Sequence, residues 1–454
     1  MFVRDLVRVV LQTSFEAFSA AQVAHGKARF IDVVGCALGG AFADGNDALL
    51  RTVRDWGGRP EATILAHGDR VPAAHAAMTN AVMARSYDYE ACGPLPLGAA
   101  RDRMPGHICA TTETTALAAG EARHRSGREV LTAALLGGDL AVRIAVAEDF
   151  SFEEGFDSTG TVCAFGAAAV AGRLWGATED QLSHAFGLLV NDIGGSFQTL
   201  WDGAQAFKLP QGLSARNALW ALELALNGMT GIEAPLTGPR GYFAQYCKGF
   251  RSEFLTQDLG TAFATQGLHK AQPACYGSHS AIEAALQLRP QVAVDHIEQV
   301  RVAVFGPIAQ GFLGQPFRAD DTPVRALFSL PYTVASALVR GESRLAYFTE
   351  EGVRDPRVLD LAARVQVEAA ATPTLADMGV TVTTRSGQTL HAGLRMPRGL
   401  AESPLTLEEI EQKYWTNYEH ARPIPRRQAE EALDRLRHFE EVDDVATLTR
   451  LLKK

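Results

Sequence analysis

The stretch HIEQVRVAVFG, residues 296–306, decides the fold class, because here a helical chain first changes to strand. Val300, Val302 and Val304 alternate with other residues, and a period of two is typical of a half-buried strand. The first 260 or so residues of the chain are dominated by Ala, Leu and Val at helical spacing, with Gly or Pro-Gly closing the segments. In one of them Thr178 and Gln181 form a predicted capping box.

The strand pattern returns further along the chain. ARVQVEA at 363–369 predicts one strand, and MGVTVTTRSGQTLHAGLRM at 378–396 predicts two more joined at Ser386-Gly387. FSLPYTVASALVR at 328–340 is helical in period, and from Ser403 the chain is helical again after a capping box of Thr406 and Glu409. We therefore predict a mainly α protein, with a helical domain built from 1–262 and 403–454 and a smaller α+β domain over 263–402.

Composition excludes several classes of protein. The chain has 454 residues, 47% of them apolar, a net charge of -9 and no Lys/Arg cluster apart from Lys453-Lys454, which argues against nucleic acid as a partner. The N-terminus lacks the unbroken apolar core of a signal peptide, and no apolar run reaches the length of a membrane span. The cysteines are scattered without a C-x-x-C pair, as expected of free thiols in a reducing compartment. We expect a cytoplasmic protein that does not bind membranes.

Ionisable side chains gather where one apolar helix ends, in NAVMARSYDYEAC at 80–92 and in Pro105-Gly106-His107. Asp88 lies between Tyr87 and Tyr89, which could desolvate its carboxylate and raise its pKa toward that of a base. It could equally be a hydrogen-bond acceptor at a helix end. His107 could transfer a proton near neutral pH or cap the helix that follows.

Lysine is rare in this chain, because only seven of the 43 Lys and Arg residues are Lys. Lys208 in QAFKLPQG and Lys270 in GLHKAQPAC both lie beside proline-marked turns, where an ammonium group could meet a ligand carboxylate. The alternative is two solvated surface lysines. His279 could be a plain helix-terminal residue, Asp157 a turn residue and Tyr332 a core residue.

Metal and cofactor motifs are absent from the sequence. It contains no H-E-x-x-H, no P-loop, no cluster-binding cysteine spacing and no G-x-G-x-x-G after a strand. We therefore predict proton transfer without a metal or cofactor.

The order of these segments resembles the MmgE/PrpD family, which includes 2-methylcitrate dehydratase, cis-aconitate decarboxylase and iminodisuccinate epimerase. The resemblance covers nearly the whole chain. It rests on FIDVVGCALGGA, RPEATILAHGDRVPAAHAAMTNAVMARSYDYE, the PGH segment, GFDSTGTVCAFGAAAVAG, KLPQGLSARNAL, GPRGYF, HKAQPACYGSHSAIEAAL, FSLPYTVASAL and PRGLAESPLTLEEIEQKY.

The resemblance implies a homodimer acting on a small carboxylate, with the site between the helical domain and an α+β lid. By position, Asp88 matches the first acid of the family's D-Y-D-D run, His107 the histidine of H-P-G, and Lys270 the lysine of K-P-Y-P-x-C. His279 matches the histidine that ends that segment, and Tyr332 the tyrosine of F-S-x-x-Y. Lys208 resembles the lysine of K-R-L-H-P-G, with spacing one residue short.

Departures from the family pattern bear on the reaction. Arg85 replaces a histidine, and Glu90-Ala91 replaces the last two acids of the D-Y-D-D run. Asp157 stands where decarboxylase and dehydratase relatives carry histidine, and Cys275 stands where the decarboxylase has one. A carboxylate at 157 adds negative charge to a site for polyanions, so the departures disfavour a cis-aconitate decarboxylase.

The working mechanism places His107 or Asp88 as the base that removes a proton from a carbon next to a carboxylate. Lys208 and Lys270 hold substrate carboxylates, and Tyr332 or His279 stabilises charge or protonates the leaving group. Loss of hydroxide would make the protein a dehydratase, which we place first, and reprotonation on the other face would make it an epimerase. A non-catalytic ligand-binding protein is the alternative of another class. The residues expected to bind substrate are Arg85, Asp157, Cys275 and His279.

Overall fold

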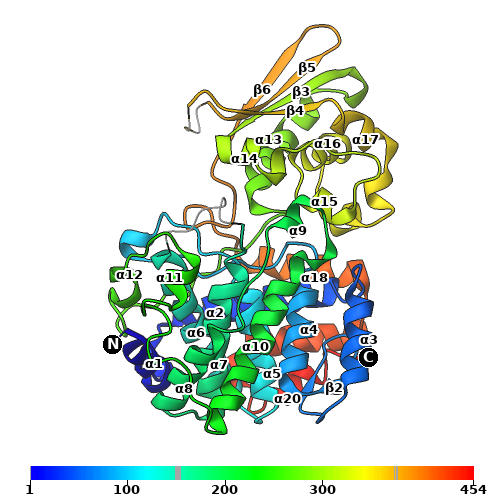
Figure 1. The fold of residues 1–454 in the computed structure, drawn as a ribbon. Coiled ribbons are helices and arrows are strands. Elements are labelled where there is room, and N and C mark those ends of the chain that lie inside the picture. The colour runs from blue at the N-terminus through cyan, green and yellow to red at the C-terminus, as the bar shows by residue number, and fades with distance from the viewer. Residues whose placement is uncertain (1, 149–154, 373, 375–376) are drawn as a thin grey trace.

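A computed structural model describes residues 2–148, 155–372, 374 and 377–454 (Figure 1). The chain is 56% helical, with only small sheets, so the prediction of a mainly α protein is confirmed. A block of helices forms the lower part of the molecule in Figure 1, and a unit that carries a four-stranded sheet lies above it. The exact domain boundaries and the lid stay predictions.

The centre of the helical block consists of helices that are apolar on nearly every side. Every residue of α5 is buried, and all but two of the residues of α7 are buried, which is the pattern of a helix enclosed by others. The predicted capping box at the start of α8 is confirmed, because Thr178 and Gln181 bond each other's backbone amides. The helices of the block before the sheet are α1 Phe2–Gln12, α2 Ala20–Gly39, α3 Asn46–Trp56, α4 Ala73–Arg85, α5 Cys109–Glu121, α6 Gly127–Ala147, α7 Thr159–Trp175, α8 Glu179–Leu189, α9 Gln198–Trp201, α10 Leu209–Leu226, α11 Tyr242–Tyr246 and α12 Glu253–Thr256.

Helix α6 is long and apolar enough to cross a membrane, but 94% of its apolar stretch is buried inside the structure. Other helices cover it, so α6 is placed as a core helix. The cytoplasmic location and the homodimer stay predictions.

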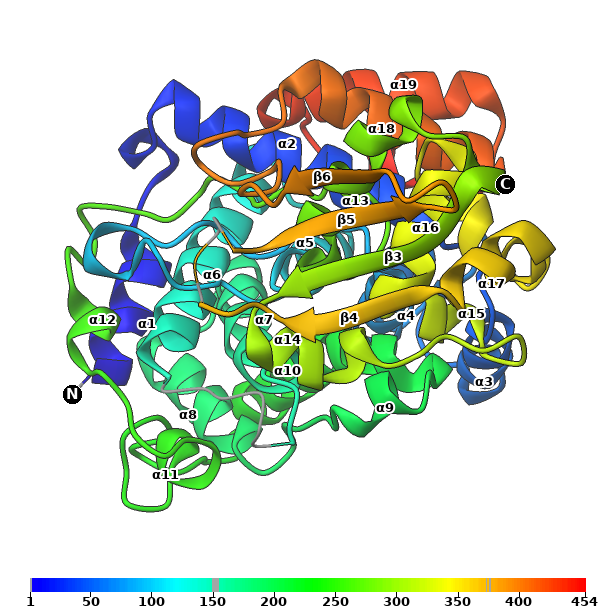
Figure 2. The same ribbon diagram turned by 90° about the horizontal axis from the view of Figure 1, so that it is seen from above.

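The C-terminal segment returns to the helical block. Helices α18 (Leu407–Ala421) and α19 (Arg426–Arg437) pack on α2, as Figure 2 shows, and α20 (Ala446–Thr449) contacts α5. The predicted capping box at Thr406 and Glu409 starts α18. A short pair of strands, β1 (Ala62–Thr63) and β2 (Arg70–Val71), completes this part.

The sheet of the upper unit has the strand order β4-β3-β5-β6. Strand β3 (Ile297–Val304) is parallel to β4 (Val365–Ala369) and antiparallel to β5 (Gly379–Thr384), which pairs with β6 (Thr389–Gly393). All three predicted strand regions are confirmed, and Val300, Val302 and Val304 are buried together. The helices of this unit are α13 His279–Leu288, α14 Gly306–Gln310, α15 Pro323–Leu327, α16 Leu330–Arg340 and α17 Pro356–Ala362.

Helices α13 and α16 pack on this sheet and lie between it and the helical block (Figures 1 and 2). The chain that leads up to α13 runs beside the loop after α4, because Cys92 donates its amide to the carbonyl of Leu268 at 2.8 Å and Pro94 bridges to Gly267. This pairing brings residue 270 next to residue 88.

Candidate functional site

The predicted site stretch forms a tight turn at the end of α4. The helix ends at Arg85, and the amide of Asp88 donates to the carbonyl of Arg85 at 3.0 Å. Asp88 has a φ of 48°, in the left-handed region that Asp tolerates better than most residues. The turn directs Asp88 and Glu90 inward, and neither side chain is exposed to solvent.

Two cations neutralise these carboxylates. Nη1 of Arg85 contacts Oδ1 of Asp88 and lies 3.2 Å from Oε1 of Glu90. The Nζ atom of Lys270 donates to Oδ1 of Asp88 at 2.5 Å and to its carbonyl oxygen at 2.6 Å. Buried ions persist only when they are paired, so the two cations and two carboxylates form one electrostatic unit.

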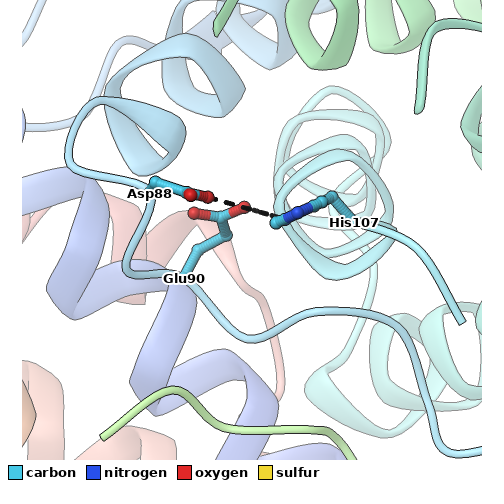
Figure 3. A group of neighbouring side chains, drawn as sticks. All are labelled: Asp88, Glu90 and His107. Carbon is cyan, nitrogen blue, oxygen red and sulfur yellow. Dashed lines mark hydrogen bonds and ion pairs between the residues drawn. The ribbon is translucent and has the colours of Figure 1, made fainter. Parts of the chain in front are cut away.

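His107 completes the cluster from the start of α5. Its Nδ1 lies 2.9 Å from Oε1 of Glu90 and 3.9 Å from Oδ1 of Asp88 (Figure 3). Burial and the positive charges of Arg85 and Lys270 lower the pKa of His107 to about 3. Burial raises the pKa of Glu90, but the charge of Arg85 and the hydrogen bond from His107 outweigh it, so the net shift is downward.

These shifts assign the protons in the pair. An ionised Glu90 accepts the Nδ1 proton of a neutral His107, which leaves a lone pair on Nε2. The His107 side chain is 22% exposed, whereas those of Asp88 and Glu90 are 0% exposed. His107 is therefore the member of this group of three through which the cluster can reach a ligand.

His279 lies on the far side of Lys270. Both Lys270 Nζ and His279 Nε2 approach the carbonyl oxygen of Ala274, at 3.4 and 3.3 Å. Burial and the charge of Lys270 lower the pKa of His279 to about 3, and burial lowers the pKa of Lys270. Ala274 has a φ of 133°, which a non-glycine residue rarely adopts, so the surrounding contacts hold this carbonyl in place.

Lys208 does not join the cluster, contrary to the expectation that it acts with Lys270. Its Nζ donates to the carbonyl of Asp44 at 2.6 Å. It lines a separate pocket of about 230 Å³ with Tyr87, Phe348 and His420, where the helical block meets the upper unit. Burial lowers the pKa of Lys208 to about 8.

Tyr332 also lies apart from the cluster. Its side chain is fully buried inside the upper unit, and its hydroxyl donates to the carbonyl of Tyr347. Arg340 donates to the same hydroxyl at 3.3 Å. Tyr332 thus packs inside the upper unit, and its catalytic role stays a prediction.

Asp157 and Cys275 flank the cluster without an ion pair to it. Asp157 accepts the amide of Thr159 at 2.9 Å, and within the described part of the chain no ion pair joins it to Arg85. Burial raises the pKa of Asp157, and the charge of Arg85 acts in the opposite direction, so the two are in electrostatic reach. Cys275 is half-buried and acts electrostatically on Lys270.

Comparison with known proteins identifies the family. A model of the MmgE/PrpD N-terminal domain matches residues 4–255, more than half of the chain, and a model of the MmgE/PrpD C-terminal domain matches residues 273–438. The chain belongs to the MmgE/PrpD family. It is 22% identical over 421 residues to a cis-aconitate decarboxylase-like protein of Aspergillus oryzae, covering 86% of this chain and 85% of that protein. It is also 22% identical over 448 residues to the cis-aconitate decarboxylase of Mus musculus, covering 95% of this chain and 89% of that protein.

Glu90 is the cluster residue that the sequence patterns do not predict. In the sequence it is only a departure from the MmgE/PrpD pattern. In the structure its Oε1 atom connects Arg85 to His107, and Gln211 Nε2 donates to the same atom at 3.4 Å. The signal was Arg85 itself, because an arginine in place of a histidine adds a permanent charge that a buried site must balance with a nearby carboxylate.

Asp88, Glu90 and His107 also have the spacing of a metal site, since each offers a ligand atom within 4.8 Å of the others. The carboxylate oxygens nearest to His107, however, already contact Arg85, and one of them also accepts from Lys270. A divalent ion would have to displace buried cations from those oxygens. This MmgE/PrpD cluster therefore fits acid–base chemistry better than metal binding, and independence from metals and cofactors stays a prediction.

Proposed function

We propose that this MmgE/PrpD protein is a cofactor-independent enzyme that removes a proton from the carbon next to a carboxylate of a small di- or tricarboxylate. We place it as a carbon–oxygen lyase of the 2-methylcitrate dehydratase kind. The observation that carries the proposal is the hydrogen-bonded pair of His107 and Glu90 between the cations Arg85 and Lys270. Its two relatives named for cis-aconitate decarboxylation support a carboxylate as substrate.

His107 acts as the general base through Nε2. Glu90 fixes its tautomer and ring orientation, and stabilises the imidazolium that forms when the proton arrives. A pKa of about 3 makes the free imidazole a weak base. Burial lowers this pKa most, and the charges of Arg85 and Lys270 lower it further. A substrate carboxylate near the two cations would offset their charges, so binding itself would raise the pKa of the base.

The cations stabilise the charge that the reaction creates. Removing the proton places negative charge on the substrate carboxylate, and Lys270 and Arg85 are already in place beside the base. Loss of hydroxide from the neighbouring carbon then gives the alkene. Because His279 is held neutral and Tyr332 lies in the upper unit, neither is assigned as the acid for the leaving group.

An epimerase of an amino- or iminodicarboxylate is the second candidate. Asp157, in place of a family histidine, is in electrostatic reach of Arg85 without being paired to it. A carboxylate in this position would suit a substrate amine, and return of the proton on the opposite face would invert the centre.

The test is proton NMR in D2O with a panel of di- and tricarboxylates, with and without hydroxyl or amino groups. Loss of a signal next to a carboxylate and growth of an alkene signal would support the dehydratase. Deuterium at an inverted centre would identify the activity as epimerisation instead of dehydration. Release of carbon dioxide would identify it as decarboxylation. No exchange with any panel member, from a folded protein, would overturn the proposal in favour of a non-catalytic ligand-binding protein.

Matched variants assign the base within the same experiment. His107→Gln should lower the exchange rate about 100-fold or more, because it removes the general base. The control is His391→Gln, which changes a histidine on β6 that bonds Thr381 and belongs to the sheet of the upper unit. This variant should leave the exchange rate unchanged.

A further inference from the structure

We infer that a buried centre formed by Asp32, His269 and Lys413 positions the acid–base cluster. Its effect on turnover rests on the proposed function.

Asp32 is the middle of this centre. It lies on α2 with no exposed surface. Its Oδ2 atom lies 2.7 Å from Nδ1 of His269 and 2.8 Å from Nζ of Lys413, and its Oδ1 atom accepts the amide of Ala91 at 3.0 Å. Burial raises the pKa of Asp32, but Lys413 and His269 outweigh it and the net shift is downward, so the carboxylate is ionised.

Two partners of Asp32 are sequence neighbours of cluster residues. Ala91 follows Glu90, and His269 precedes Lys270. Lys413 also donates to the carbonyl of Tyr89 at 2.6 Å, between Asp88 and Glu90. One carboxylate thus fixes the backbone on both sides of the ion pair between Asp88 and Lys270.

Helix α18 holds the turn at a second point. Nε2 of His420, seven residues after Lys413, lies 2.9 Å from the hydroxyl of Tyr87. The Lys413 ammonium also lies 4.1 Å from the centre of the Tyr89 ring. The helix therefore contacts the residues before and after Asp88, whose left-handed backbone needs such support.

This centre is almost fully buried. The side chains of His269 and Lys413 are 7% and 3% exposed, and that of Asp32 is 0% exposed. None of the three bonds a cluster side chain directly, because their links run through the backbone at Tyr89 and Ala91. They are positioning residues that act through residues 87–93, which follow α4 and are called the 87–93 turn below.

The test is hydrogen exchange by mass spectrometry on the full chain. The double variant Asp32→Asn with Lys413→Met removes both charges together, since removing one alone would leave an unpaired buried charge. We expect peptides over 87–93 to exchange about tenfold faster or more, with peptides over α7 unchanged. Unchanged exchange at 87–93, or equal acceleration in α7, would overturn the inference.

The control is a second ion pair between α2 and the C-terminal segment. Lys27 and Glu440 lie 2.8 Å apart, and neither contacts the 87–93 turn. Lys27→Met with Glu440→Gln should leave exchange at 87–93 at the wild-type rate. If the first double variant does not fold, Lys413→Arg provides the test, because it keeps the charge but changes the distance over which the side chain reaches the Tyr89 carbonyl. Faster exchange confined to residues 87–93 would support the inference. Wild-type exchange at these residues would overturn it.

Turnover gives the second measurement. Misplacing the turn should lower kcat about tenfold to 100-fold with KM changed less than about threefold, and Lys413→Arg should recover part of kcat. A variant with faster local exchange and wild-type kcat would overturn the positioning role. If the wild-type protein turns over no panel member while local exchange still rises, the proposed function fails and the structural inference stands.

Discussion

Lys270 and Lys208 lie in regions that differ in how each ammonium is balanced. Lys270 is fully buried and donates twice to Asp88, inside a cluster with two cations and two carboxylates. Lys208 lines a pocket and donates to the neutral carbonyl of Asp44. The partners are 182 and 164 residues away in sequence. The difference shows that partners far away in sequence decide how the charge of a buried lysine is balanced. The proline-marked turns next to Lys208 and Lys270 do not decide it.

The largest expected contrast is in stability. Lys270→Met leaves Asp88 without one of its cations and should lower the free energy of unfolding by about 3–5 kcal/mol. Lys208→Met leaves only a carbonyl beside a pocket and should change it by less than about 1 kcal/mol. Urea unfolding followed by circular dichroism measures both, and equal losses would remove the contrast.

The next effect tests the orienting role of Glu90. Glu90→Gln keeps the size of the side chain but removes the charge that fixes the tautomer of His107. We expect the rate of proton exchange in D2O to fall about 100-fold, with Glu223→Gln on α10 as the matched control. A rate within about twofold of wild type would show that His107 does not depend on Glu90.

A smaller effect is the pH dependence of stability. The pKa values of His107 and His279 are lowered from 6.5 to about 3 in the folded protein. Between these values only the unfolded chain binds the two protons, so stability falls as pH falls below 6.5, by about 1.4 kcal/mol per pH unit for each histidine. Urea unfolding between pH 5 and 7 should show stability falling with pH, and His279→Gln should reduce the slope by the contribution of one histidine.

The smallest expected effect sharpens the comparison at the Lys208 pocket. Because Lys208 contacts no member of the cluster in this structure, Lys208→Met should change the exchange rate by less than about threefold. A loss as large as that of His107→Gln would show that the pocket and the cluster act on one substrate. The NMR assay that tests the proposed function measures this directly.

Local sequence patterns predicted much of the fold. The alternation of Val300, Val302 and Val304 and the capping boxes at Thr178 and Thr406 appear in the structure as predicted. The pairing of α18 with α2 has no such local signal. Lys413 and Asp32 meet across 381 residues, and only tertiary packing joins them.

The site was predicted in part. Family resemblance pointed to Asp88, His107 and Lys270, which the structure brings together. Glu90 was missed because its role depends on Arg85, a departure from the family pattern. Resemblance also pointed to Tyr332, but a motif match does not reveal that a backbone carbonyl binds its hydroxyl.

The place of Lys413 in the chain has a consequence for biosynthesis. Asp32 leaves the ribosome 381 residues before Lys413, its counter-ion. A nascent chain that stops before α18 carries a carboxylate that cannot be buried without its cation. We therefore expect the 87–93 turn to close only after α18 has been synthesised, so a product that stops before α18 should be left open to proteolysis there.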